Sequence, residues 1–381
     1  MKRNLSIVIF AILSLIFAAL IAGDYDKVIA SEATLEQLIE KAKNGDADAQ
    51  LNLGFRYKKG KDATKDLVES VKWFRKAAEQ GNTEAQYNLA ICYYKGEGVT
   101  KDLDEAFKWF TKSVEQGFAE AQCFLGFCYY KGEGVKKDLD EAVKWFRKAA
   151  EQGDADAQFN LGLCYHDGEG VTKDLDEAFK WLKKSAEQGH AYAQCYLGVC
   201  YKYGEGVTKD LVESVKWFRK AAEQNYEIAQ CNLGTCYYKG EGVTKDLAEA
   251  FKWYKKAAEQ GFVEAQDNLG VCYYKGYGVT KDLVEAVKWF RKASEQEHAK
   301  AQYILAICYY NGRGVTPDLD EAIKWLKKSA EQGHANAQYL LGICYHNGEG
   351  VTNDLEEAIK WYKKAAKQGH SQAKQILKEL E

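Results

Sequence analysis

The sequence predicts an all-α fold, an α/α solenoid of about nine 36-residue helix-turn-helix repeats with a capping helix at each end. Three observations support this prediction. All nine tryptophans of the 381-residue chain recur at an interval of 36 residues, from Trp73 to Trp361. A period in this range is typical of stacked supersecondary units. Each repeat also carries two amphipathic patterns of helical spacing, and glycines separate the two.

The first 30 residues differ from the rest of the chain. Lys2 and Arg3 precede an apolar run over residues 5–22 that two serines interrupt. This pattern is typical of a secretory signal peptide, and the run is also long enough for a signal anchor. We expect residues 1–30 to be one of these two segments. In both cases the positive end stays inside, so the rest of the chain is expected to be extracytoplasmic: periplasmic, secreted or anchored to the inner membrane.

The ends of the repeat array are expected to be helical caps. The pattern predicts an N-terminal capping helix in residues 31–45, nine repeats in residues 46–369 and a C-terminal capping helix in residues 370–381. The first cap aligns with the second helix of a repeat, but Gln37 stands where tryptophan would be. The last cap aligns with a first helix, but Lys374 replaces the usual glutamine. More polar end units keep a stack of repeats soluble and finite.

Each repeat is expected to contain two helices that pack against each other. In the first helix of the second repeat, residues 84–95, apolar side chains fall at i, i+4, i+7 and i+8 and so share one face. They are Ala85, Leu89, Cys92 and Tyr93. The second helix, residues 102–116, places Ala106, Trp109 and Phe110 on one face. We expect the tryptophan to be the main buried anchor of the second helix.

The residues at the helix ends are consistent with these boundaries. Asp102 and Glu105 predict a reciprocal capping box, and this D-x-x-E pair occurs in all nine repeats. The Gly-Glu-Gly-Val stretch at residues 96–99 predicts the bend between the helices. We expect its valine side chain to pack into the core. The second helix usually ends at a glycine, which favours a left-handed conformation. Asn225 and Glu297 take that place in two repeats, and at the glutamate we expect strain or a different exit.

Composition and charge are those of an ordinary soluble protein. Hydrophobic residues make up 46% and charged residues 29%, and the formal net charge is −3. No run of like charges occurs. A general nucleic-acid binder needs a basic face, so we expect no nucleic-acid partner.

The stretch AQYNLAICYYKGEGVTKDLDEAFKWF, residues 85–110, resembles the Sel-one-like repeat family, relatives of the tetratricopeptide repeats. The matching elements are A-Q-x-x-L-G/A, Y-x-x-G-x-G-V, D-x-x-E-A-x-x-W and K-A-A-x-Q-G, and together they cover residues 46–369. The resemblance implies a right-handed superhelix of antiparallel helix pairs that acts as an adaptor for partner proteins. In bacteria, relatives are often exported and contribute to envelope assembly, signalling or host contact.

One column of residues near the end of the first helix is the candidate partner-binding groove. It consists of Tyr94, Tyr130, His166, Lys202, Tyr238, Tyr274, Tyr310 and His346. By analogy with tetratricopeptide repeats, this column faces the concave side. Tyrosine suits a surface that must be both apolar and hydrogen-bonding. The alternatives are that the rings only pack between repeats, or that they line a glycan-binding groove.

The cysteines and histidines predict neither a metal site nor a cofactor. Eight of the eleven cysteines form one column beside the core tyrosine and are expected to be small buried hydrophobic residues. They are Cys92, Cys128, Cys164, Cys200, Cys236, Cys272, Cys308 and Cys344. Helices stack about 8–10 Å apart, beyond the ~7 Å Cα limit of a disulfide, so a ladder of disulfides is not expected. No C-x-x-C or H-E-x-x-H motif occurs.

The sequence predicts a binding protein rather than an enzyme. Ser371 and Lys374 match the S-x-x-K motif of penicillin-recognising enzymes, but the partner motifs S-D-N and K-T-G are missing. We therefore expect no catalytic residues and an exported scaffold that binds an unidentified protein or peptide through its concave groove. The alternatives are a cell-envelope glycan-binding protein and a weak penicillin-recognising hydrolase.

Overall fold

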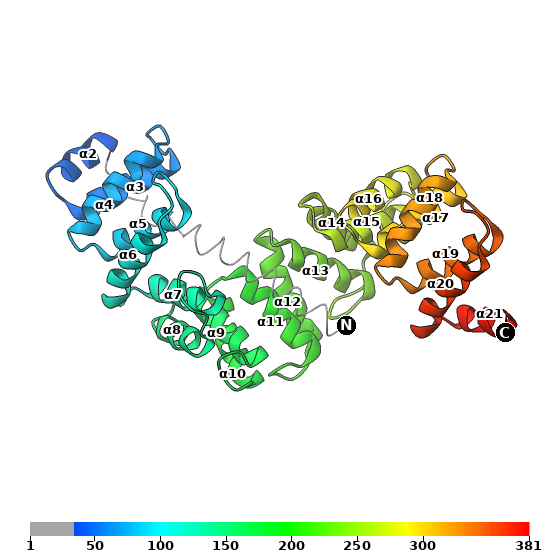
Figure 1. The fold of residues 1–381 in the computed structure, drawn as a ribbon. Helices are drawn as coiled ribbons and strands as arrows, with labels where there is room; N and C mark the ends of the chain where they lie inside the picture. The colour runs from blue at the N-terminus through cyan, green and yellow to red at the C-terminus, as the bar shows by residue number, and fades with distance from the viewer. Residues whose placement is uncertain (1–33, 381) are drawn as a thin grey trace. The chain divides into compact units, whose positions relative to one another are not determined.

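The computed structural model describes residues 34–380, and in this part of the chain all regular secondary structure is helical. The chain divides into two compact units, of which unit 1 ends at Lys209 and unit 2 begins at Asp210. Figure 1 shows each unit as a series of antiparallel helices packed side by side. The predicted all-α fold of repeated helix pairs is confirmed.

Odd-numbered helices from α3 to α19 are the first helices of the repeats, and even-numbered helices from α4 to α20 are the second helices. In unit 1 the helices are α2 (Leu35–Lys43), α3 (Ala47–Lys59), α4 (Leu67–Glu79), α5 (Thr83–Lys95), α6 (Leu103–Glu115), α7 (Ala119–Lys131), α8 (Leu139–Glu151), α9 (Ala155–Asp167), α10 (Leu175–Glu187) and α11 (Ala191–Tyr203). In unit 2 they are α12 (Leu211–Glu223), α13 (Glu227–Lys239), α14 (Leu247–Glu259), α15 (Val263–Lys275), α16 (Leu283–Glu295), α17 (Ala299–Asn311), α18 (Leu319–Glu331), α19 (Ala335–Asn347), α20 (Leu355–Lys367) and α21 (Ser371–Leu380).

The second helices begin at an aspartate cap, but only half of the predicted capping box is present there. Asp102 Oδ1 accepts from the Glu105 backbone N–H at 3.0 Å. The Asp102 N–H donates to the Tyr93 carbonyl at 3.0 Å, so it is already used by the first helix of the same repeat. Glu105 instead accepts from Lys108 Nζ at 2.9 Å. The Asp102 N–H is therefore not available to the Glu105 side chain, because the Tyr93 carbonyl on the other side of the bend accepts from it.

Left-handed residues form the bends and the helix exits, as predicted. Gly98 has φ 71°, and a Cβ built on it would lie 2.0 Å from the Leu67 carbonyl oxygen of the preceding repeat, so no larger residue fits. Asn225 and Glu297 adopt φ 68° and 63°. Glu297 therefore adopts the same left-handed conformation that glycine adopts at this place in other repeats. This confirms the expectation of backbone strain at Glu297 and not that of a different chain path.

The predicted tryptophan anchor of the second helix is buried in seven of the nine repeats, and the residue after it is buried more completely. Trp145 is one of the two half-buried tryptophans, whereas Phe146 is 1% exposed. The Phe146 ring fits against Gly126 of α7, where an added Cβ would meet the ring at 2.8 Å. Lys148 Nζ sits 4.1 Å from the Trp145 ring centroid and covers this ring.

The ends of the array and the N-terminal segment complete the description. Helix α2 packs Leu38 and Ala42 against α3, and α21 packs Ala373 against α20. The segment predicted to be a signal peptide or anchor, residues 1–30, lies outside the described residues. Within residues 34–380, no helix combines the length and the hydropathy needed to cross a bilayer.

Candidate functional site

The predicted groove column reaches from the end of each first helix to the bend of the following repeat. In unit 1, Tyr94 Oη donates to Glu133 and Tyr130 Oη donates to Glu169. His166 Nε2 lies 3.4 Å from Glu205 Oε2. These contacts join consecutive repeats, so the column has a structural role in the stack.

The column is closed in unit 1 and more open in unit 2. Tyr94, Tyr130 and His166 are 8–9% exposed, and Lys202 is half-buried. In unit 2 the corresponding side chains are half-buried or exposed; they are Tyr238, Tyr274, Tyr310 and His346. The structure therefore does not bring the eight residues together as one accessible surface. Their use in partner binding stays a prediction.

Two of these tyrosines line pockets between neighbouring first helices of unit 2. Pocket A lies between α13 and α15 and has a volume of about 220 Å³. It is lined by Thr235, Tyr238, Lys239, Tyr254, Asn268, Val271, Cys272, Tyr277 and Lys300. Pocket B lies between α15 and α17 and has a volume of about 280 Å³. It is lined by Val271, Tyr274, Lys275, Phe290, Tyr303, Ile304 and Ile307. The two pockets share Val271 and so are adjacent.

The side chain at one position of the first helix differs from repeat to repeat. The positions of Asn268 in pocket A and Ile304 in pocket B are equivalent to that of Phe124 in α7. The Phe124 ring stacks on Phe110 at a centroid distance of 4.2 Å and meets Tyr94 edge-on at 5.3 Å, which fills the equivalent space beside Tyr94. Asn88 and Asn160 occupy the same position in unit 1, so its size alone does not decide whether a pocket is open.

The position of Val271 also varies in size. In unit 1 its equivalents include Phe127 and Leu163, which are 2% and 4% exposed, and also Val199. Asn268 and Val271 were not among the predicted site residues. No single position could have identified them, because Asn160 and Val199 of unit 1 carry the same residue types.

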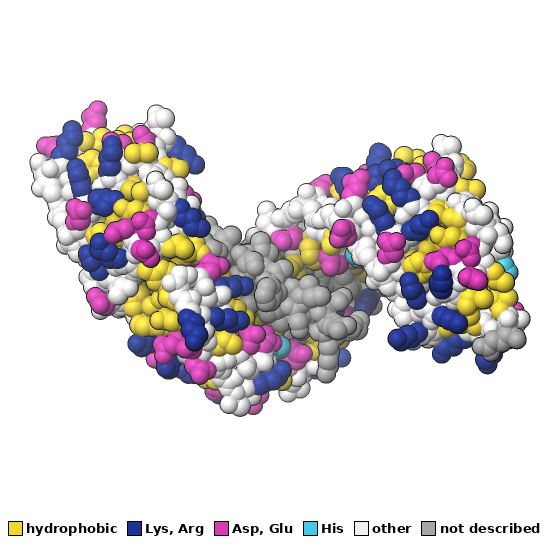
Figure 2. Space-filling view, viewed as in Figure 1, with side chains coloured by type: hydrophobic (Ala, Val, Ile, Leu, Met, Phe, Trp, Pro, Cys, Tyr) yellow, Lys and Arg dark blue, Asp and Glu magenta, His cyan; other side chains and the backbone are white. Residues whose placement is uncertain are grey.

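The rims of the pockets are basic. The second residue of the bend is glutamate in most repeats, but Tyr277 and Arg313 occupy it beside the pockets. Arg313 Nη1 donates to Tyr274 Oη at 2.6 Å, and Lys275 Nζ lies 5.5 Å from the Tyr274 ring centroid. Lys300 Nζ lies 2.7 Å from Asp267 Oδ2. Basic and acidic side chains are interspersed elsewhere on the visible face of unit 2 (Figure 2).

The walls of the pockets offer neutral hydrogen-bonding groups. Burial raises the pKa of Tyr254, so this phenol stays protonated, and its Oη lies 3.2 Å from Thr235 Oγ1. Burial also raises the pKa of Tyr303 in pocket B. Pocket B is otherwise mostly apolar, with Phe290, Ile304 and Ile307. This arrangement suits recognition of apolar side chains, and no nucleophile with an adjacent base lines either pocket.

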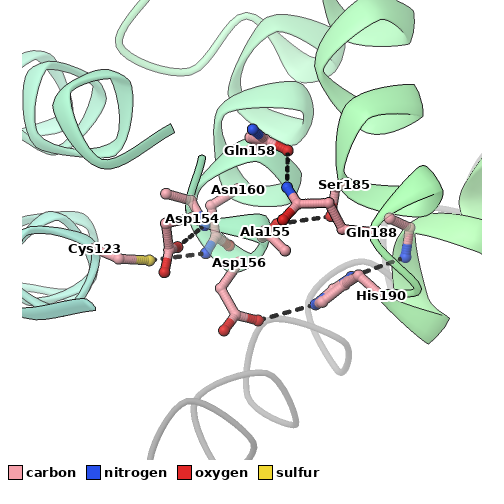
Figure 3. Close-up of polar contacts among 11 residues, drawn as sticks. Cys123, Asp154, Ala155, Asp156, Gln158, Asn160, Ser185, Gln188 and His190 are labelled. Atoms are coloured by element: carbon pink, nitrogen blue, oxygen red, sulfur yellow. Dashed lines mark hydrogen bonds and ion pairs between the residues drawn. The ribbon is translucent and has the colours of Figure 1, made fainter. Parts of the chain in front are cut away.

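A second candidate is a polar cluster in unit 1, where α7, α9 and α11 meet. Figure 3 shows Cys123 against Asp154 and Asn160, while Asp156 reaches His190. Asn160 Nδ2 lies 3.9 Å from Cys123 Sγ, and His190 Nε2 lies 2.9 Å from Asp156 Oδ1. The combination of thiol, histidine and carboxylates resembles a nucleophilic site in its residue types.

The geometry assigns this cluster to helix capping. Asp154 accepts from the Ala157 N–H at 2.6 Å at the start of α9, and His190 Nδ1 accepts from the Ala193 N–H at 3.1 Å at the start of α11. Cys123 is fully buried, and burial raises the pKa of its thiol well above the usual value. A buried, protonated thiol without an adjacent imidazole is not an activated nucleophile.

All eleven cysteines lie in the described part of the chain, and all are buried, as predicted for the main column. Burial raises the pKa of Cys92, Cys308 and Cys344 to about 11. Among residues 34–380, no group of three or more histidine, cysteine, aspartate or glutamate side chains is placed to hold a metal ion.

Comparison with known proteins identifies the repeats. The family described as Sel1 repeat matches nine consecutive segments. They are residues 47–82, 83–118, 119–154, 155–190, 191–226, 228–262, 263–298, 299–334 and 335–370. The chain belongs to the Sel1 repeat family. Each matched segment holds one first helix and one second helix, so the family repeat coincides with the helix pair seen in the structure.

Two solved structures are similar to this Sel1 repeat protein over most of its length. A Sel1 repeat protein from Oxalobacter formigenes is 32% identical, covers 93% of each chain and superposes with a TM-score of 0.62. The protein c5321, a protective antigen present in uropathogenic Escherichia coli strains, is 36% identical, covers 90% of this chain and 89% of its own, and has a TM-score of 0.52. Both comparisons agree with the repeat architecture.

A curated relative matches over a shorter stretch. It is the secretory immunoglobulin A-binding protein EsiB of Escherichia coli O6:H1, which is 56% identical over 43 residues. The match spans 11% of this chain and 9% of EsiB, so it extends over little more than one repeat.

Proposed function

We propose that the chain is an exported scaffold that binds a protein partner on the first-helix face of unit 2, with pockets A and B receiving side chains of the partner. The observation that carries this proposal is the pair of adjacent pockets in consecutive repeats. The equivalent place beside Tyr94 in unit 1 is filled by the Phe124 ring. Apolar pockets with a few polar groups are typical binding sites.

Three further observations support the proposal. Sel1 repeats commonly act as protein-interaction scaffolds, and EsiB is named for binding a protein. The basic residues Lys2 and Arg3 followed by an apolar run favour export. The described cysteines are buried, and Ser371 and Lys374 lie on the exposed face of α21 without partner motifs, so nothing near the pockets supports hydrolysis.

The proposal is tested by filling the pockets. Val271→Phe introduces the side chain that unit 1 carries at Phe127, and the ring would occupy the space that Val271 leaves in both pockets. We expect helical content to be unchanged and crosslinking of a protein partner in cell-envelope extract to be lost. Circular dichroism and crosslinking with mass spectrometry measure the two quantities.

The control is Val271→Ile, which introduces the residue found at Ile91 and Ile307. This variant should retain the partner because it adds only one methylene group. Equal partner recovery by the phenylalanine and isoleucine variants would show that the pockets are not used. Recovery of polysaccharide without protein would favour the glycan-binding alternative.

A further inference from the structure

The spacing of the pockets restricts what can fill both at once. Tyr238 in pocket A and Tyr274 in pocket B occupy the same helical position in consecutive repeats, with Val271 between the pockets. Neighbouring helices pack about 8–10 Å apart, so equivalent pockets recur at roughly that interval. In a polyproline II segment, side chains i and i+3 share a face and lie about 9 Å apart, because three residues of ~3.1 Å rise make one turn.

A regular β-strand does not meet this condition. Its side chains i and i+3 point to opposite faces, and i and i+2 are only about 7 Å apart. The volumes of about 220 and 280 Å³ are suited to one side chain each. An extended segment with polyproline II geometry and two apolar side chains three residues apart therefore fits both pockets.

The rim charges indicate the remaining chemistry of the segment. Arg313 has Tyr274 Oη as its hydrogen-bond partner, and Lys275 lies by the ring of the same tyrosine. Neither cation forms an ion pair with a carboxylate of the described chain. Lys300, in contrast, is neutralised by Asp267. Two cations beside pocket B thus lack negative partners.

One cation beside pocket B stands where most repeats carry a carboxylate. Arg313 replaces the bend glutamate found at Glu97, Glu133 and Glu169. The bend residues beside the two pockets, Tyr277 and Arg313, are therefore not acidic. Charge complementarity favours an acidic ligand beside Lys275 and Arg313.

We propose that pockets A and B bind one extended acidic segment of a partner protein, with apolar side chains at positions i and i+3 in the pockets and carboxylates facing Lys275 and Arg313. This inference rests on the proposed function and specifies the chemistry of the partner. The phenols of Tyr274 and Tyr254 border the apolar side chains and supply hydrogen bonds to the backbone of the segment.

The test uses synthetic fluorescent peptides and the purified full chain. The probe is Glu-Asp-Leu-Glu-Asp-Phe-Glu-Asp, in which Leu and Phe are three residues apart. We expect saturable binding by fluorescence anisotropy, and weaker binding as the salt concentration rises, because exposed charges are screened. A peptide with lysine in place of every acidic residue should not bind. Equal binding of the basic peptide would overturn the charge assignment.

Three variants separate specific from general binding. Val271→Phe should weaken binding of the acidic peptide at least tenfold, and so should the double variant Lys275→Glu with Arg313→Glu. The control is Lys252→Glu with Lys255→Glu, which makes the same charge change on the exposed face of α14 and should retain binding. An equal loss of peptide binding in the control variant would mean that only the net charge of the protein matters, which would contradict the proposal.

The spacing is tested with two further peptides. Moving Phe to position i+2 should weaken binding at least tenfold, whereas a helical peptide with the same side chains at i and i+7 should bind no better than the probe. Tighter binding of the helical peptide would contradict the extended geometry. If no acidic peptide binds although Val271→Phe abolishes partner crosslinking, this inference fails and the proposed function stands.

Discussion

At the residue scale, Asp154 is the clearest case of a side chain whose chemistry depends on its neighbours. Burial and the nearby Asp156 carboxylate raise its pKa from the ordinary 3.8 to about 7. Its cap position is used by Asp46 in α3 and by Asn82 in α5. Asparagine is as good a helix cap as aspartate and carries no charge. The negative charge at this place is therefore costly when it is ionised.

We predict that Asp154→Asn stabilises the protein at pH 7 by about 2–4 kcal/mol, since one pKa unit corresponds to about 1.4 kcal/mol. The folded chain holds this proton up to about pH 7, and the unfolded chain releases it near pH 4. The stability of the wild-type protein should therefore fall between about pH 4 and pH 7, and the variant should lose that part of the pH dependence. Urea denaturation at a series of pH values measures both effects.

The same substitution at Asp46 is the control, because this carboxylate is exposed and its helix is capped in the same way. It should change stability by a few tenths of a kcal/mol at most. A gain of the same size in both variants would mean that burial of Asp154 is not the cause.

At the scale of the helix, the residue after the tryptophan is buried more completely than the tryptophan itself. Phe146 contacts Gly126 across the helix pair, and every repeat has Phe, Leu or Tyr at this place. The tryptophan of each repeat covers the edge of the core under a lysine. Sequence periodicity alone cannot tell these two positions apart, because both lie on the apolar face.

We predict that Phe146→Ala lowers the free energy of unfolding by about 3–5 kcal/mol, as for other fully buried rings. Trp145→Ala should cost less, because this ring is only half-buried. Since repeats open locally, hydrogen exchange of α7, α8 and α9 is the suitable measurement. A larger loss of protection in Trp145→Ala than in Phe146→Ala would contradict this prediction.

At the scale of the whole molecule, the eleven cysteines occupy two positions of the first helix and have burial in common. All are buried, and burial raises the pKa of Cys200 and Cys231 to about 12. Oxidation and disulfide exchange need an accessible thiolate. Burial is therefore expected to protect these thiols from oxidation.

We predict that the native protein reacts with almost none of its eleven thiols when treated with a thiol-specific reagent at pH 8, and that all eleven react in denaturant. Absorbance of the released thiolate dye gives the number. The rate in native buffer should follow the local opening of the repeats rather than the reagent concentration. Fast reaction of several thiols in the folded state would contradict the buried arrangement.

The fold was largely predictable because its signals are local and repeated. The aspartate caps, the bend glycines and the 36-residue tryptophan interval each act within one repeat, and nine copies remove the ambiguity of any one of them. The capping box at Asp102 was predicted wrongly because its N–H is taken by Tyr93, a partner nine residues away across the bend.

The site was less predictable because it depends on neighbours. Tyr238 and Tyr274 were in the predicted column, but so were Tyr94 and Tyr130, which the structure buries. Tyr94 is enclosed by the Phe124 ring, whereas Tyr130 is enclosed with Asn160 at the same position, so no single neighbour decides the burial. Those residues belong to the following repeat, and their effect appears only when the helices are packed.

By itself, the sequence determined the helix pairs, their ends and their family, because each 36-residue segment contains its own capping residues and its own apolar periodicity. The tertiary structure alone decided which aromatic residues line a pocket and which are enclosed. A cavity is the difference between the space that packed helices leave and the side chains that fill it. That difference depends on residues from two repeats at once.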